Sequence, residues 1–200
     1  MRDRDVRKSV WRWLEFAHAG DPDTLMLDEL GILNGATRID IAVINGKMEG
    51  FELKSERDTL ERLPTQRDLY NKVFDLISIV VAENHREAAQ DIVPEWWGLA
   101  IASSAPGGVQ VTYERQPEAN PALDAATVAS LLWRDEAVSI LERYGAARGV
   151  RSKPREALYD RLAMTLDLDT VRAEVRSALK ARAGWRVDRR FQQCGDLLLS

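Results

Sequence analysis

Asp40, Glu52 and Lys54 have the side-chain types and the spacing that metal-assisted chemistry on a phosphate requires. They lie on two short segments, 38–44 and 50–54, in which apolar and polar residues alternate as in half-buried strands. Glu52 and Lys54 are two residues apart, so their side chains share one face of the second strand. Convergent carboxylate oxygens bind a hard divalent cation, and a nearby ammonium stabilises negative charge on a phosphate. Such a site forms only if Asp40 lies on the same face.

The position of Asp40 depends on the pairing of the hairpin around Asn45-Gly46, a strong turn signal. A two-residue loop would put Asp40 opposite Phe51 and mix apolar and charged residues on both faces. A three-residue loop that includes Lys47, or a later bulge, would put Asp40 opposite Glu52. Burial favours the second pairing, because a one-residue slip exchanges the faces of a whole strand. Four apolar side chains are then expected to lie buried beneath the cluster: Ile39, Ile41, Phe51 and Leu53.

The elements that would position this site alternate between helical and extended patterns, which predicts an α/β core followed by a helical extension. The spacing of apolar residues and the positions of Gly and Pro predict helices over 4–19, 64–75, 85–91, 124–144, 154–164 and 169–183. They also predict further strands over 76–82, 99–103 and 109–113, and a linker over 114–123. We therefore expect a domain over residues 1–116 and a helical, locally basic extension over residues 117–200.

Composition limits the classes of protein to which the chain can belong. A single cysteine, Cys194, excludes a disulfide framework and suits a reducing, cytoplasmic location. The first residues mix both charge signs, which is not typical of a secretory signal, and no run of roughly 18 apolar residues predicts a membrane span. The net charge of −4 argues against a protein that coats nucleic acid by bulk electrostatics.

The charge is unevenly distributed along the chain. Residues 148–190 contain 12 Lys and Arg against 6 Asp and Glu, a local charge of +6. A basic tail on an acidic body suits an anionic partner, and Arg151, Lys153 and Arg155 are the candidates for contacts with nucleic-acid phosphates. The alternative is a solvated helical face, which composition alone favours.

The longer pattern around these residues resembles a known family. The stretches 38–42, 50–55 and 58–66, with Tyr70 and the run 93–98, look like the bacterial sce7726 family of the PD-(D/E)xK nuclease superfamily. The resemblance covers roughly residues 25 to 102, and it departs from the superfamily name in that Ile39, not proline, precedes Asp40. It implies a restriction-endonuclease-like fold, a mixed sheet flanked by helices.

The resemblance also implies roles for individual residues. The implied metal ligands are Glu29, Asp40, Glu52 and the carbonyl of Leu53. The metal would be Mg²⁺ or Mn²⁺, Lys54 would orient or activate the attacking water, and Gln66 would support the site from the following helix. Glu29 could equally be a surface residue, and Gln66 could simply pack.

Three functions are compatible with these observations. The leading expectation is a metal-dependent nuclease that hydrolyses phosphodiester bonds, with DNA as the favoured substrate. The alternative is a non-catalytic module on the same fold that binds nucleic acid or a repair partner. A third reading is an interaction protein whose helical tail docks a partner. A homodimer is compatible with each of them, and divalent-dependent cleavage would separate the first from the others.

Overall fold

The computed structural model describes the backbone of residues 2–195, and the side chains in that range except those of Asn34 and residues 183–195. Contacts divide the chain into two units, Met1–Asp124 and Ala125–Ser200. The sequence-based boundary at residue 116 stays a prediction. Among the described residues, none of the helices combines the length and the apolar character that a membrane span requires.

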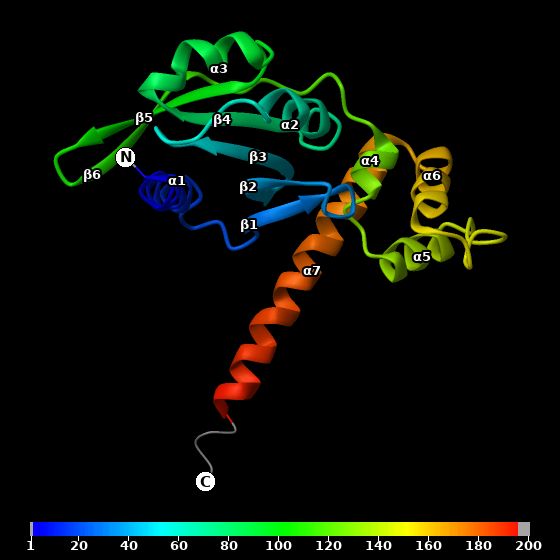
Figure 1. Ribbon diagram of the computed structural model, residues 1–200. Coiled ribbons are helices and arrows are strands. Elements are labelled where there is room, and N and C mark those ends of the chain that lie inside the picture. Colours follow the sequence, from blue (N-terminus) through cyan, green and yellow to red (C-terminus); the bar gives the residue numbers. More distant parts are fainter. Residues whose placement is uncertain (1, 196–200) are drawn as a thin grey trace. The chain divides into compact units, whose positions relative to one another are not determined.

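The first unit is built on one mixed sheet, so the expectation of an α/β core is confirmed (Figure 1). Its strands, in sheet order, are β1 (Leu25–Ile32), β2 (Thr37–Asn45), β3 (Lys47–Lys54), β4 (Leu76–Ala82), β5 (Gly98–Ala105) and β6 (Gly108–Arg115). Neighbouring strands are antiparallel except for β3, β4 and β5, which run parallel. Parallel neighbours need crossover connections, and these contain α2 (Leu63–Tyr70) and α3 (Arg86–Ile92).

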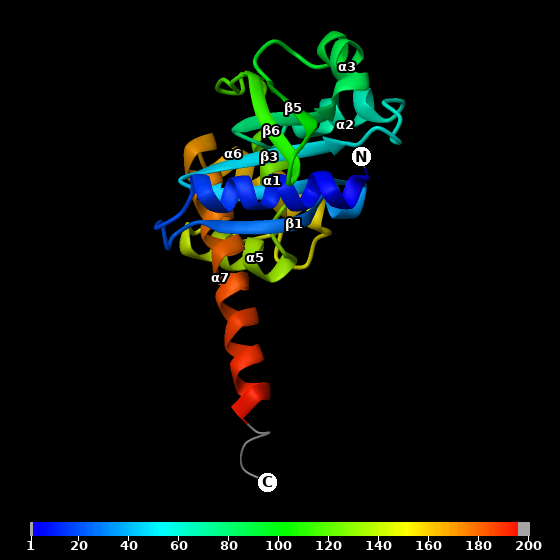
Figure 2. The ribbon, with the colours of Figure 1, turned by 90° about the vertical axis from the view of Figure 1, so that its left-hand side faces the viewer.

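The helix α1 (Asp3–Ala17) packs along the sheet beside β3 and β6 (Figure 2). It buries Val6, Val10 and Leu14 at helical spacing, the positions that the apolar period of this segment requires. Their partners on the sheet are apolar residues of four strands: Ile41, Val43, Phe51, Leu53, Val80, Ala100 and Ala102. This packing brings Arg7 of α1 within 2.6 Å of Asp40 on β2.

The hairpin of β2 and β3 has the register that burial favours. Ile41 lies opposite Phe51 and Asn45 opposite Lys47, so the predicted register is confirmed from Ile41 to the turn, but the pairing does not continue to Asp40 and Glu52. Gly46 occupies the turn with a φ of +65°, a left-handed conformation that glycine adopts without strain. All four apolar side chains expected beneath the cluster are buried.

The arrangement around the hairpin differs from expectation in two respects. Ile39 does not lie in the same layer as Ile41 and Phe51. Ile39 lies beside Gly50 and Phe74, whereas Ile41 and Phe51 pack against α1. The second face of the hairpin is not polar, since Ala42, Ile44 and Met48 are also fully buried. Crossover helices cover a sheet with parallel strands, so its central strands are enclosed on both sides.

The linker expected over 114–123 is not a free segment, since its first two residues end β6 and later ones are hydrogen-bonded to the first unit. The amide of Glu118 donates to Trp96 O at 2.8 Å, and the Asn120 side chain donates to Asn71 O and Phe74 O, each at 2.7 Å. These hydrogen bonds hold the segment on the first unit. Its two prolines and polar composition predicted a linker and gave no sign of these contacts.

The second unit contains α4 (Ala125–Ala129), α5 (Arg134–Arg143), α6 (Arg155–Thr165) and α7 (Leu168–Gly195). The single helix expected over 124–144 is wrong, because the chain leaves the helical conformation before Trp133, whose backbone is extended. Glu136 accepts the Trp133 amide at 2.7 Å and so caps a new helix start. Leu131 and Leu132 remain buried across the break.

Candidate functional site

Glu52 is the centre of a buried polar cluster on β3 and α2. Its side chain is 2% exposed. One carboxylate oxygen, Oε1, accepts from Lys54 Nζ and from Gln66 Nε2, each at 2.7 Å. The other, Oε2, lies 2.9 Å from the hydroxyl of Tyr70. The spacing of Gln66 and Tyr70, one turn apart on α2, puts both side chains over the same strand.

The Tyr70 hydroxyl lies near two acceptors. The Tyr70 hydroxyl contacts Arg38 O at 2.5 Å as well as Glu52, but it has one proton to donate. Burial raises the pKa of Glu52 and the charge of Asp40 raises it further, while Lys54 lowers it. Burial also raises the pKa of Tyr70, so the phenol stays neutral.

Asp40 lies at the edge of this cluster and has its own set of donors. Its Oδ2 accepts the Leu53 amide at 2.8 Å, and its Oδ1 accepts from Arg7 at 2.6 Å. Because this amide donates to a side chain, the regular pairing of β2 and β3 ends at Ile41. Burial raises the pKa of Asp40, against the lowering effect of the Leu53 amide and of Arg7.

Arg7 is the functional residue of this site that sequence reasoning missed. Besides Asp40, it donates to Asp28 Oδ1 at 2.7 Å and so ties α1 to two strands. Its position on a helix 33 residues before Asp40 carries no local signal of this contact. Only the packing of α1 on the sheet brings the guanidinium to the carboxylates.

The donor set does not fit a resident divalent cation. Of the four carboxylate oxygens of Asp40 and Glu52, three accept from N–H groups and the fourth contacts the Tyr70 hydroxyl. Glu29, on β1, forms an exposed ion pair with Arg38 at 3.1 Å. No group of three His, Cys, Asp or Glu side chains within the described part of the chain could hold a metal ion. The Mg²⁺ or Mn²⁺ site therefore stays a prediction that the geometry does not support.

The structure thus brings together some of the predicted residues and leaves others apart. The residues brought together are Asp40, Glu52, Lys54 and Gln66, with the Leu53 amide rather than its carbonyl. Their catalytic roles stay predictions, because every contact seen here is a hydrogen bond or ion pair within the fold. Cys194 and the basic residues after Arg182 have side chains that lie outside the described ones.

The predicted phosphate contacts lie in the second unit, in the connection between α5 and α6 and at the first residue of α6. Arg151, Lys153 and Arg155 are exposed there, as is Arg148. Ala147 and Val150 are buried, and the Lys153 amide donates to Val150 O at 2.9 Å, which holds the connection in a defined shape.

Comparison with known proteins changes the interpretation of the whole chain. The family model for bacteriophage P4 protein cII matches residues 1–194. Among curated proteins, protein cII of Enterobacteria phage P4 is 25% identical over 182 residues, covering 91% of this chain and 68% of that protein. No solved structure matches the chain.

The identification with the sce7726 family and the PD-(D/E)xK nucleases is therefore wrong, as are the expectations of a nuclease and a Mg²⁺-dependent hydrolase. The resemblance depended on about half of the chain and on a motif of common residue types. Here those residue types build a hydrogen-bonded cluster that joins β3 to α2. A match over nearly all residues, in contrast, shows that the chain belongs to the bacteriophage P4 protein cII family.

Proposed function

We propose that this member of the P4 cII family binds nucleic acid without cleaving it, with DNA as the favoured ligand. The observation that carries the proposal is the connection between α5 and α6. Residues 144–155 contain no acidic residue and four exposed cations: Arg148, Arg151, Lys153 and Arg155. Cations on a surface of defined shape bind phosphates with less loss of conformational entropy than cations on a mobile tail.

The four cations are not equally available to a ligand. Arg151 forms an ion pair with Glu142 of α5. Arg148 and Lys153 form no ion pair within the part of the chain that the structure describes, so their charge is the more available for an incoming phosphate. Arginine and lysine contacts to phosphates position a protein on nucleic acid without reading bases. We therefore expect affinity that varies little between sequences.

The test is fluorescence anisotropy of a labelled DNA duplex over a range of salt concentrations. The double variant Arg148→Ala/Lys153→Ala should weaken binding similarly across sequences. Loss of two phosphate contacts should also reduce the slope of log K against log salt by about 2. The matched control is Arg57→Ala/Lys72→Ala, which removes one exposed Arg and one exposed Lys from the first unit. The recovered DNA should be uncut.

An unchanged affinity and salt slope in the α5–α6 variant would overturn this function. Equal losses in the variant and its control would do the same, because they would reflect net charge alone.

We also infer a restriction-endonuclease-like arrangement for strands β2 to β5, serving here as a scaffold. What supports it is the order of an antiparallel hairpin, a helical crossover and two parallel strands. An experimental structure tests this inference, since its core should superpose on that fold with strand order and directions preserved. A cytoplasmic location is part of the proposal, supported by the single cysteine.

A further inference from the structure

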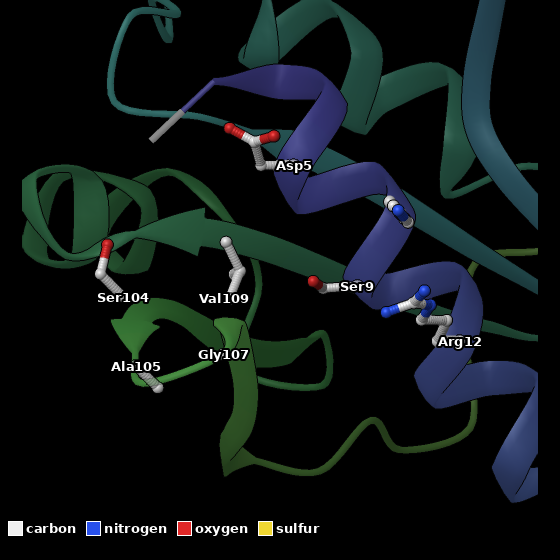
Figure 3. A pocket seen from close by; sticks show the side chains of 9 residues that line it. Asp5, Ser9, Arg12, Ser104, Ala105, Gly107 and Val109 are labelled. Carbon is white, nitrogen blue, oxygen red and sulfur yellow. The ribbon is translucent and has the colours of Figure 1, made fainter.

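A polar pocket lies between α1 and the hairpin of β5 and β6 (Figure 3), and none of its lining residues belongs to the cluster around Glu52. Its volume is about 560 Å³. Lys8, Ser9 and Arg12 line it from the helix, and Ser104 and Gly107 line it from the hairpin. The size falls in the range of sites for small ligands, roughly 300–1,000 Å³, and exceeds what a single phosphate group needs.

The two cations of this pocket are uncompensated. Lys8 and Arg12 are four residues apart on α1, so their side chains share a face. Both side chains are exposed, and neither forms a hydrogen bond or an ion pair within the described part of the chain. Like charges at this spacing destabilise an isolated helix by about 0.2–0.5 kcal/mol. An anion bound between them would remove that repulsion.

Arg7, the neighbour of Lys8 in sequence, provides the contrast. Its charge is neutralised by Asp28 and Asp40, with contacts of 2.7 and 2.6 Å. Asp5 is the acidic residue among those that line the pocket, and one of its carboxylate oxygens contacts the Arg2 amide at 3.3 Å. The lining, with Lys8, Arg12 and Asp5 as its charged residues, therefore keeps a net positive charge.

The hairpin adds neutral groups that suit an oxyanion. Ser104 and Ser9 present hydroxyls from the two walls (Figure 3). Gly107 and Gly108 have φ values of +103° and +139°, and a Cβ on either would meet no atom within 4 Å. The turn therefore leaves open space beside these two glycines. Hydroxyls, together with Arg and Lys, are groups that bind phosphate oxygens.

We propose that this pocket binds the phosphate group of a nucleotide, with Lys8 and Arg12 as its cationic ligands. The phosphate could belong to a free nucleotide or to a nucleic-acid strand, since both present the same oxyanion. The volume beyond the phosphate would accommodate the sugar and base. This site does not depend on the α5–α6 surface.

The test uses the full chain labelled with ¹⁵N and three probes: inorganic phosphate, ATP and a ten-nucleotide single strand of DNA. Binding should shift the amide resonances of Lys8, Arg12, Gly107 and Gly108. The variant Lys8→Ala/Arg12→Ala should reduce the affinity for the bound probe at least tenfold, as measured by calorimetry. Arg57→Ala/Lys72→Ala removes the same charges elsewhere and should retain wild-type affinity. The side chains of Lys8 and Arg12 are exposed, so the circular dichroism spectrum of the pocket variant should match that of the wild-type protein.

The probes separate the two sources of the phosphate. If ATP binds in the pocket, the ligand is a free nucleotide. If the DNA strand binds there and ATP does not, the ligand is a phosphate group within nucleic acid. The proposal is overturned if no probe shifts the pocket resonances, or if the pocket variant and its control lose equal affinity. Loss of DNA binding in Arg148→Ala/Lys153→Ala with intact pocket shifts would leave both proposals standing. If the pocket resonances do not shift and Arg148→Ala/Lys153→Ala still loses DNA binding, the pocket proposal alone is overturned.

Discussion

Lys54→Met should destabilise the first unit by about 3 kcal/mol at neutral pH, because it leaves Glu52 buried without its cation. The side chains of Lys54 and Glu52 are only 12% and 2% exposed, with 2.7 Å between Nζ and Oε1. Breaking a buried pair by removal of one partner costs about 3–5 kcal/mol. The lower end applies because Gln66 continues to donate to the carboxylate at 2.7 Å. Methionine approximates the length of the lysine stem, so little packing is lost.

The loss should depend on pH in a definite direction. Burial already raises the pKa of Glu52, and Lys54 opposes that rise. Without the cation, the pKa of Glu52 should rise further. A carboxyl group with a raised pKa in the folded state binds a proton on folding. Stability therefore falls as the pH rises from the unfolded value, about 4.3, through the folded pKa. The destabilisation by Lys54→Met should be larger at pH 8 than at pH 5.

Urea unfolding at pH 5 and pH 8, followed through the exposure of the buried Trp97, measures these differences. Glu52→Gln in the Lys54→Met background should recover stability at pH 8, because a neutral amide needs no cation. Lys72→Met, at an exposed lysine of the same unit, is the control and should change stability by less than about 0.5 kcal/mol. A Lys54→Met variant as stable as wild type at both pH values would refute the reasoning.

Two further substitutions test the packing around the cluster. Gly50→Ala should cost about 1–3 kcal/mol, because a Cβ there would lie 2.9 Å from Ile39 Cδ1 and 3.0 Å from the Phe74 ring; an unchanged urea midpoint would contradict this close approach. Tyr70→Phe should cost about 1–3 kcal/mol, because it removes the hydroxyl that contacts Arg38 O at 2.5 Å and leaves buried acceptors unsatisfied. Thermal and urea unfolding at pH 7 measure that cost, and a stability equal to wild type would show that water replaces the hydroxyl.

Much of the candidate site could be predicted from local pattern. Alternation in 38–44 and 50–54 predicted the strands, and burial selected the pairing of Ile41 with Phe51. This worked because a strand has a side-chain period of two, so one register alone buries both apolar sets. The same reasoning failed for the second face of the hairpin, since helices from other parts of the chain cover it.

The functional interpretation failed for a different reason. Glu52, Lys54 and Gln66 are residue types that a metal site and a structural cluster both use. Sequence spacing brings them together in either case, but it does not say which atoms their oxygens contact. The match of residues 1–194 to the P4 cII family overturned the nuclease, and the contacts of Glu52 explain what the motif does instead.

The sequence by itself determined the α/β class, the register of β2 with β3 and the apolar stripe of α1, because each depends on the periodicity of a single segment. Only the tertiary structure decided that Arg7 neutralises Asp40 and that Lys8 and Arg12 face the β5–β6 hairpin across a pocket. Those contacts join residues far apart in the chain. Nothing in the local pattern distinguishes Arg7 from Lys8 one position later, and the packing angle of α1 on the sheet gives one charge a partner and leaves the other open to a ligand.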